Sequence, residues 1–437
     1  MKTKPCHKIA AVQAGLLLAL APAAHAQSLP PEVQVGASTI IDYEFDWGRD
    51  GIHCSSCNFG DGNNRLSFID SEGNLWIGHV DADNGDFLPG DGEEELVDTD
   101  AIPAQITFNG PEWMSLQNGS ALVYDRYADG KPHSPSNMCV GFARVVAAGS
   151  WTGGCMPRTN GTIFPGGTDI VGDPSPLVSY QNYSQTITNI YWRPVRQGAP
   201  VHEVLTGSDQ SQISRRWISG THKLLLTAPP PDGPANAVRQ VFRYTTGSDV
   251  LEQLTFDRTN KTSAFMWQAP EYQDSYVFFA RIGQSEIDVY RYLPNPEGSS
   301  SWQVTKRIRS TPDMPYIFSP EPFVYNGKSW IFFAISSEPE GQNGAATNQL
   351  AMSGIEPEAS TFRVLTSDVP DARARRDPEY YITANGPYIY YNRYIPVDPG
   401  PNLSEGVFRV DAGLGPPLTA RPHNRRGSGI ESTSEAP

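Results

Sequence analysis

One short pattern occurs four times in this chain, and it constrains the fold more than any other feature of the sequence. A Pro-Glu pair is followed about ten residues later by a strongly apolar, aromatic run. The copies read GPEWMSLQNGSALVYDR from residue 110, APEYQDSYVFFAR from 269, SPEPFVYNGKSWIFFAI from 319 and DPEYYITANGPYIYYNR from 377. A unit that recurs along a chain of this length indicates small sheets packed against one another.

Each unit continues with further strand patterns. Strands such as RQVFRYT (239–245) and EIDVYRY (286–292) come next, and a Leu-Thr or Val-Thr pair closes the unit. These landmarks give about seven units, beginning near 50, 110, 173, 214, 269, 319 and 377, and a count of six also fits. Four short strands in every 40 to 60 residues predict an all-β fold, a single β-propeller with four-stranded blades. Two β-sandwiches are the main alternative, but no linker-like composition shift interrupts the middle of the chain.

The two ends of the repeat region predict how the ring closes. The last unit offers only three strands, and the segment GASTIIDY (36–43) precedes the first unit without a unit of its own. We therefore expect 36–43 to complete the last blade as its outer strand, which would remove the exposed edges of an open ring. The propeller is expected to span 27–414, and the Pro/Arg/Ser/Gly/Glu-rich residues 415–437 are expected to be a disordered tail.

The first 26 residues have the pattern of a secretory signal peptide. Three lysines precede an apolar run that ends in Ala24-His25-Ala26, and this run is too short to span a membrane. We therefore predict a periplasmic or secreted protein without a membrane span. Removal of this leader takes away three lysines and no acids, so the formal net charge of −15 becomes −18. Such a charge argues against nucleic acid and anionic membranes as partners.

Four cysteines follow the predicted leader, and an even number in an oxidising compartment predicts two disulfides. We expect Cys54 to pair with Cys57, and Cys139 to pair with Cys155 across a hairpin. The HCSSC stretch (53–57) is alternatively a redox or metal motif, although no second CxxC follows it.

The stretch from 214 to 257, which contains SRRWISGTHKLLLTA and QVFRYTTGSDVLEQLTFD, resembles the propeller repeat of TolB-like proteins. In that repeat a Trp precedes a turn, an apolar strand, a second strand with its own turn, and a Leu-Thr end. The stretch NNRLSFIDSEGNLWIGHVD (63–81) is similar in part. The resemblance implies a propeller but no catalytic residue set, because TolB-like propellers host transport partners, peptidase gates and lyases. The segment DPEYY…PYIYYNR also looks like a blade start of five-bladed glycosidases, although the units here are too many for that family.

The recurring glutamate is expected to lie at the central channel. Pro is tolerated at the first residue of a strand, so the Pro-Glu pair is predicted to open the innermost strand of each blade. The residues then aligned around the channel are Cys57, Glu112, Ser175, Arg216, Glu271, Glu321 and Glu379.

A purely structural interpretation gives each channel glutamate an arginine partner. A buried carboxylate needs a partner, and arginines follow the aromatic pair of the second strand in several units. The expected pairs are Glu112 with Arg126, Glu271 with Arg281, and Glu379 with Arg393.

The positions that break this pairing give the functional hypothesis. Glu321 has Ile335 in place of an arginine, Arg193 has Ser175 in place of a glutamate, and Arg216 replaces a glutamate. Unpaired charge beside a channel is costly as structure and useful as chemistry. We therefore predict Glu321, Arg193 and Arg216 as the catalytic set, with Glu321 as general acid or base. The expected substrate-binding residues are Glu112, Glu271, Glu379, Trp113, Trp192, Trp217 and Tyr272.

No cofactor or metal site is predicted, although one segment resembles a calcium loop. The acid-rich stretch 81–95 departs from EF-hand spacing, because Asp86 stands where glycine is required. A hairpin turn at Asn84-Gly85 explains this stretch more simply than calcium does.

Two functions fit these predictions. The first is an enzyme acting on a polysaccharide or oligosaccharide, as a hydrolase or a lyase, because carboxylates, arginines and aromatic rings suit sugars and uronates. The second is a non-catalytic propeller that binds a small ligand or an envelope protein. The two differ in whether Glu321 and Arg216 converge on one open pocket.

Overall fold

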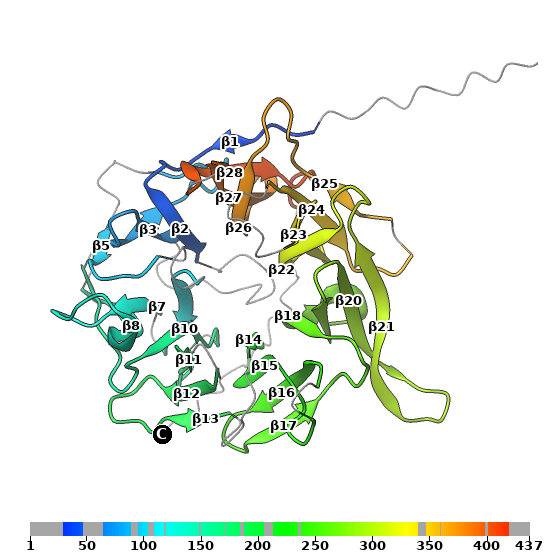
Figure 1. Cartoon of the computed structure of the whole chain (residues 1–437), viewed down its shortest axis with the longest axis horizontal. Helices are drawn as coiled ribbons and strands as arrows, with labels where there is room; N and C mark the ends of the chain where they lie inside the picture. The colour runs from blue at the N-terminus through cyan, green and yellow to red at the C-terminus, as the bar shows by residue number, and fades with distance from the viewer. Residues whose placement is uncertain are drawn as a thin grey trace, which may run out of the picture.

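The computed structural model describes residues 29–46, 64–88, 95–103, 109–117, 119–147, 150–170, 172–183, 188–204, 213–234, 237–339, 347–358, 360–397 and 401–418. These residues form seven four-stranded antiparallel sheets arranged as a ring around a central axis (Figure 1). The chain is therefore a seven-bladed β-propeller, as the repeat predicts. Within the described residues, no helix is long and apolar enough to cross a membrane.

The blades follow one another in chain order, each running from its innermost to its outermost strand, and the seventh blade takes its outer strand from the N-terminal region. The first blade contains β2 (Ile40–Phe45), β3 (Arg65–Asp70), β4 (Leu75–His79) and β5 (Glu95–Asp98), and the second contains β6 (Glu112–Ser115), β7 (Ser120–Tyr127), β8 (Met138–Ala147) and β9 (Ser150–Thr152). The third contains β10 (Thr162–Gly167), β11 (Leu177–Asn182), β12 (Ile190–Pro194) and β13 (His202–Glu203), the fourth contains β14 (Ile213–Trp217), β15 (Lys223–Ala228), β16 (Gln240–Thr245) and β17 (Val250–Gln253), and the fifth contains β18 (Lys261–Ala269), β19 (Ser275–Ile282), β20 (Glu286–Pro294) and β21 (Ser300–Arg309). The sixth contains β22 (Tyr316–Tyr325), β23 (Lys328–Ser336), β24 (Gln349–Gly354) and β25 (Arg363–Val364), and the seventh contains β26 (Ala374–Thr383), β27 (Gly386–Ile395), β28 (Leu403–Asp411) and β1 (Val33–Gln34). Two 3₁₀ turns, η1 (Pro135–Asn137) and η2 (Pro270–Tyr272), complete the described elements.

The hydrophobic core lies between neighbouring blades. One cluster joins Trp267 of the fifth blade to Phe332 of the sixth and Tyr391 of the seventh, and all three side chains are fully buried. A second cluster joins Leu225 of the fourth blade to Phe278 of the fifth. Each sheet therefore buries both faces against its neighbours, which explains why the second strands read as continuous apolar runs.

The ring closes through an N-terminal strand, but the predicted segment for this role was wrong. Strand β1 pairs antiparallel with β28, with Val33 opposite Arg409 and Gln34 opposite Phe408. The predicted segment 36–43 instead leads into β2, which is the innermost strand of the first blade. The physical reason is burial: all but one residue of β2 is buried, as an inner strand requires, whereas both residues of β1 are exposed.

The Pro-Glu pairs of the sixth and seventh blades lie inside the innermost strand rather than at its start. Pro320 and Pro378 sit at β-bulges, where the register shifts between Phe318 and Glu321 in β22 and between Arg376 and Glu379 in β26. The residue before each proline has a positive φ, 42° at Ser319 and 54° at Asp377. An innermost strand has a free edge, so a proline there removes no ladder hydrogen bond.

Three of the predicted unit starts were displaced. The first blade begins at β2 instead of near 50, and the third begins at β10 instead of near 173. In the fifth blade, Pro270-Glu271 forms η2 between β18 and β19, so it is a hairpin turn and not an inner-strand bulge. The bulge of that blade lies earlier, between Thr262 and Phe265.

Several predictions concern residues outside the described ranges, namely the leader (1–26), Cys54, Cys57 and the tail from 419 onward. The first residues of the predicted tail are described. The Gly415 carbonyl accepts a hydrogen bond of 2.6 Å from the Tyr325 hydroxyl, and the Leu418 amide donates to Asn326 over 2.9 Å. This part of the chain therefore contacts the β22–β23 turn.

Candidate functional site

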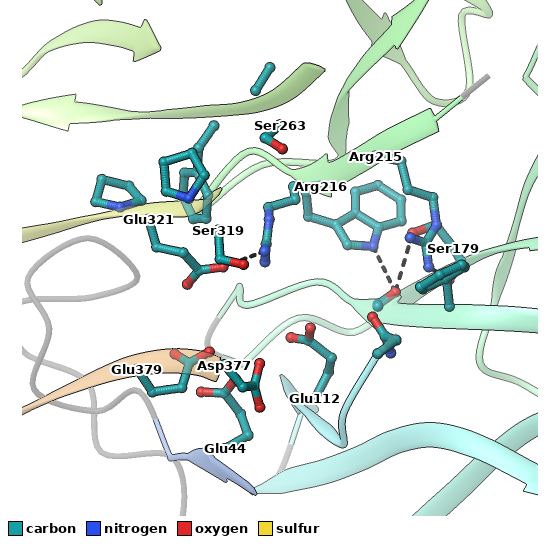
Figure 2. A pocket seen from close by; sticks show the side chains of 18 of the residues that line it. Glu44, Glu112, Ser179, Arg215, Arg216, Ser263, Ser319, Glu321, Asp377 and Glu379 are labelled. Atoms are coloured by element: carbon teal, nitrogen blue, oxygen red, sulfur yellow. Dashed lines mark hydrogen bonds and ion pairs between the residues drawn. The ribbon is translucent and has the colours of Figure 1, made fainter. Parts of the chain in front are cut away.

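A cavity of about 480 Å³ lies at the centre of the ring, and it is lined by innermost strands of successive blades. Six acidic side chains line it. Five come from innermost strands of four blades, Glu44 from β2, Glu112 from β6, Glu321 from β22, and Asp377 and Glu379 from β26 (Figure 2), and the sixth, Asp169, follows β10. Arg215 and Arg216 reach the same space from β14. We call this space the axial cavity. Its volume lies within the range of small-molecule sites in proteins.

The β-bulges help to explain why these side chains point into the axial cavity. In β26 the register shifts between Arg376 and Glu379, and both Asp377 and Glu379 line the cavity from this bulge. Alternation along a regular strand places such residues on one face without turning them toward the axis. The sequence Asp-Pro-Glu therefore delivers two carboxyl groups from one strand.

Arg216 and Glu321 form an ion pair across the cavity, between the fourth and sixth blades. The two predicted residues therefore converge within hydrogen-bond reach on one open pocket. The Arg216 side chain is 42% accessible and the Glu321 side chain 17% accessible, and both line the axial cavity. Burial opposes the charge on Arg216, but Glu321 and Glu112 outweigh this effect and raise the pKa of its guanidinium.

The other carboxyl groups hold their protons more tightly than usual. Burial raises the pKa of Glu112 to about 7, and Glu321 adds to the rise while Arg216 opposes it. Burial and the charge of Glu321 raise the pKa of Asp377 to about 6. Burial and Glu44 raise the pKa of Glu379 well above its ordinary value. These groups therefore keep their protons to a higher pH than a free carboxyl group does, and Glu112 is divided between its two forms near neutral pH.

Glu321 is the carboxyl group that forms an ion pair with Arg216 in the axial cavity. Burial raises its pKa as well, but the Arg216 guanidinium opposes that rise by charge and by a hydrogen bond. A positive group that donates directly to a carboxylate stabilises the ionised state. The site thus combines several carboxyl groups of raised pKa, one of which is ion-paired with a cation.

Polar and aromatic groups complete the wall. The Trp217 indole N–H donates to the Gly166 carbonyl over 2.9 Å, which fixes the ring beside the cavity. Arg215 donates to the Ser179 carbonyl over 3.3 Å, and burial lowers its pKa to about 10 although Glu112 opposes the change. The cavity wall also includes Phe265, whose ring lies 5.2 Å from the Arg216 guanidinium carbon.

The predicted glutamate–arginine pairs do not form. Arg126 instead bonds Asp98 over 2.6 Å, and Arg393 bonds Glu405 over 2.8 Å. Arg281 lines the axial cavity and donates to the Ile317 carbonyl over 2.9 Å. These three arginines lie on second strands, one strand further from the axis, where other partners reach them first.

Two of the predicted charged site residues lie outside the axial cavity. Arg193 is on β12, the third strand of its blade, because the third blade begins one strand earlier than its sequence landmarks indicate. Glu271 lies in η2, where its carboxylate accepts from the Ser329 amide (2.9 Å) and hydroxyl (3.0 Å).

Among the predicted aromatic residues, Trp217 lines the axial cavity and the other three do not. Trp113 is buried in the core and its indole donates to the Glu44 carbonyl over 3.2 Å. Trp192 donates to the Tyr244 hydroxyl over 3.2 Å, and the Tyr272 ring lies 3.5 Å from the Arg291 guanidinium carbon.

Sequence reasoning did not find Glu44, Asp377, Arg215 and Phe265. Asp377 directly precedes a recognised Pro-Glu pair, and Arg215 directly precedes Arg216, so proximity to a motif was a usable signal for both. Glu44 has no proline before it, and the bulge of β18 carries Phe265 after Ser263-Ala264. Nothing in the repeat pattern identifies these two positions.

The disulfide between Cys139 and Cys155 is confirmed, with the two Cα atoms 5.8 Å apart. In the acid-rich segment, described as far as Leu88, a bridge pairs Val80 with Phe87 and the Asp86 carboxylate bonds Arg409 over 2.7 Å. Within the described ranges, no group of three or more His, Cys, Asp or Glu side chains is placed to share one metal ion.

No protein-family model matches this chain, and no curated protein matches it. Solved structures that resemble it include TolB from Acinetobacter baumannii (14% identity, 80% of this chain and 79% of that chain covered, TM-score 0.35). Others are the polysaccharide lyase Uly1 (8%, 88% and 99%, 0.46) and prolyl oligopeptidase B from Galerina marginata (11%, 77% and 46%, 0.40). The chain thus spans less than half the length of that prolyl oligopeptidase. At these identities the likeness concerns the propeller fold alone.

Proposed function

We propose that this chain is a carbohydrate-acting enzyme that hydrolyses a glycosidic bond in the axial cavity by general acid–base catalysis. The observation that carries the proposal is that a candidate proton donor and a candidate base both line the axial cavity. Glu112 has a pKa raised to about 7, and Glu321 is ion-paired with the Arg216 guanidinium. Two titratable groups whose surroundings give them different protonation states are the mark of an acid and a base at work together.

The roles follow from these environments. Glu112 is the proton donor to the leaving oxygen, since it keeps its proton near neutral pH. Glu321 activates water or stabilises positive charge that develops on the sugar ring, since its ion pair with Arg216 favours the carboxylate form. Asp377 and Glu379 bind sugar hydroxyls, and the aromatic Trp217 and Phe265 supply apolar wall against the ring.

The engagement of Arg216 by Glu321 favours neutral or amine-bearing sugars over uronates in the axial cavity. Six carboxyl residues and three arginines line it among the described residues. Arg216 is engaged by Glu321, and Arg193, which was predicted as part of the catalytic set, lies elsewhere. A uronate would have to displace Glu321 before it could bind the Arg216 guanidinium. The hydrolase is therefore favoured over a lyase acting on uronates.

The test is a screen of the purified protein against neutral, amino and uronic-acid oligosaccharides. With the best substrate, Glu321→Gln and Glu112→Gln should each lower kcat by about 10²- to 10⁴-fold, with unchanged circular dichroism. Glu297→Gln, in an exposed turn, is the matched control and should keep full activity. Full activity in Glu321→Gln would refute the catalytic assignment.

One observation favours a second candidate, a non-catalytic propeller that binds a glycan or an envelope protein. Arg216 and Glu321 satisfy each other across the axial cavity, so the pocket holds a stable charge pair before any ligand enters. Under this alternative the wild type binds a glycan by calorimetry without turnover, and Glu321→Gln changes affinity alone.

We also infer export from the cytoplasm and a relationship to TolB-like propellers. The leader pattern in 1–26 supports export, and the Cys139–Cys155 disulfide is typical of an oxidising compartment. The TolB-like stretch 214–257 folds as the fourth blade, β14–β17. N-terminal sequencing of the protein secreted by a native or bacterial host tests the first inference, with Gln27 expected as the first residue.

A further inference from the structure

A second concave surface, of about 680 Å³, lies beside the second and third blades. It shares no lining residue with the axial cavity. Three arginines line it, Arg144 from β8, Arg193 from β12 and Arg196 beyond that strand, together with apolar side chains that include Phe142 and Met156. We call this surface the arginine cleft.

Arg193 is the central feature of the arginine cleft. Its residue is 1% accessible, and its guanidinium donates to the carbonyls of Pro157, Pro194 (3.3 Å) and Arg196 (3.5 Å). It makes no ion pair with any carboxylate in the described part of the chain. Carbonyl dipoles satisfy its hydrogen bonds but leave a full positive charge without a counter-charge, which is costly in a buried position.

The lining of the arginine cleft adds further positive charge beside Arg193 and no acidic side chain. Burial lowers the pKa of its guanidinium, and Arg158 acts in the same direction although Tyr180 opposes it. The residues described as lining the cleft include three arginines and no Asp or Glu. The whole chain has a formal net charge of −15, so a cleft without acids departs from the rest of the molecule.

The walls of the arginine cleft are held in place. Cys155, at one wall, is tied to Cys139 of β8 by the disulfide, and Met156 is buried. The Pro157 carbonyl accepts a hydrogen bond from Arg193, and Pro174 and Pro176 stiffen other parts of the lining. Such a site is formed before a ligand arrives, which reduces the entropy lost on binding.

We propose that the arginine cleft binds an anionic ligand in which a carboxylate is joined to an apolar group. The carboxylate would lie against Arg193 between Arg144 and Arg196, which are both exposed and able to turn toward it. The apolar part would cover Phe142 and Met156. The shared chemistry fits two sources, a free aryl or alkyl carboxylic acid and the C-terminal carboxylate of a peptide that ends in an apolar residue.

Isothermal titration of the full protein with phenylpropionate tests the proposal. We expect saturable binding that weakens as salt is raised, and no binding of the neutral phenylpropionamide. The double variant R144Q/R196Q should weaken binding at least tenfold, because it removes two of the three charges while keeping the buried Arg193. The matched control Arg243→Gln, which alters an arginine on β16, should bind as the wild type does.

A short peptide that ends in phenylalanine, as free acid and as C-terminal amide, identifies the source of the carboxylate. Tighter binding of the free-acid peptide than of phenylpropionate assigns the cleft to peptide termini, and the reverse assigns it to free acids. Equal binding of acid and amide probes, or unchanged binding in R144Q/R196Q, would overturn the proposal. Glu321→Gln should leave phenylpropionate binding intact, so loss in that variant would place the probe in the axial cavity and also overturn it.

Discussion

Glu379 and Glu32 are both partly buried glutamates, yet their surroundings shift their pKa values in opposite directions. Burial and neighbouring carboxyl groups raise the pKa of Glu379 well above its ordinary value. Burial acts the same way on Glu32, but hydrogen bonds from Arg375 and Tyr391 outweigh it and lower the pKa. The sign of the nearest charge therefore decides whether a carboxyl group opposes or supports the fold at neutral pH.

The raised pKa of Glu379 predicts a variant that is more stable than the wild type. A carboxyl group with a raised folded pKa destabilises progressively as pH rises above the unfolded value of 4.5. Glu379→Gln removes this penalty, so its free energy of unfolding should exceed that of the wild type by about 1 kcal/mol at pH 8 and match it near pH 5. Urea denaturation at both pH values measures the difference, and a gain that does not grow with pH would contradict this prediction.

At the scale of elements, the β-bulges in β22 and β26 are the features from which innermost strands contribute acidic side chains to the axial cavity. In β22 the bulge places Ser319 in the left-handed region, with φ of 42°, directly before Pro320 and Glu321. A residue with a β-carbon tolerates this conformation poorly, and a β-branched residue tolerates it least.

Ser319→Val should therefore destabilise the sixth blade. We expect a loss of about 1–2 kcal/mol in the free energy of unfolding, together with a displaced Glu321 and lower activity. Ser319→Gly is the control, because glycine adopts positive φ freely, and it should stay within about 0.5 kcal/mol of the wild type. Equal stability of the valine and glycine variants in chemical denaturation would show that the bulge carries no strain.

The same element explains which site residues the sequence could predict. Glu112, Glu321 and Glu379 follow a proline and were found, as was Arg216, which was aligned with them. Glu271 also follows a proline, but its Pro-Glu pair closes a hairpin turn. The amino-acid sequence alone does not distinguish a β-bulge from a hairpin turn, because both conformations favour proline and tolerate a polar residue after it.

Strand order within a blade set the other limit on prediction. Arg193 was assigned to a second strand near the axis, but β10 precedes that blade's sequence landmarks and moves Arg193 one strand outward. The blade count, the four strands per blade and closure by an N-terminal strand were predictable, since each depends on repeated apolar runs. The closing strand itself was not, because two exposed residues, Val33 and Gln34, carry no pattern.

At the scale of the whole molecule, one ion pair helps to keep the ring closed. Glu32, next to β1, bonds Arg375 of β26 over 2.7 Å and Tyr391 of β27 over 2.6 Å. Arg375 is 1% accessible, so the pair lies in a poorly hydrated place. The inner and outer strands of the seventh blade are thus joined by side chains as well as by the sheet.

Glu32→Gln should destabilise the closed ring by about 2 kcal/mol at pH 7, because Arg375 loses a charged acceptor. The lowered pKa of Glu32 gives the sign of the pH effect: its contribution is present above the unfolded value of 4.5 and is lost as pH falls through the lower folded value. The deficit of the variant should therefore shrink below about pH 4. Thermal unfolding across this range measures it, and a deficit independent of pH would assign the effect to packing.

The pairing of β1 with β28 also means that the propeller can close only after the end of the chain has been synthesised. Val33 leaves the ribosome early, whereas its partner Arg409 is made 376 residues later. At ordinary elongation rates the delay is roughly 20–75 s, during which the seventh blade has no outer strand. During this time β1 has no pairing partner, because the last blade of the propeller is not yet synthesised. Any factor that shields β1 would therefore bind the nascent chain and dissociate once synthesis has passed Arg409.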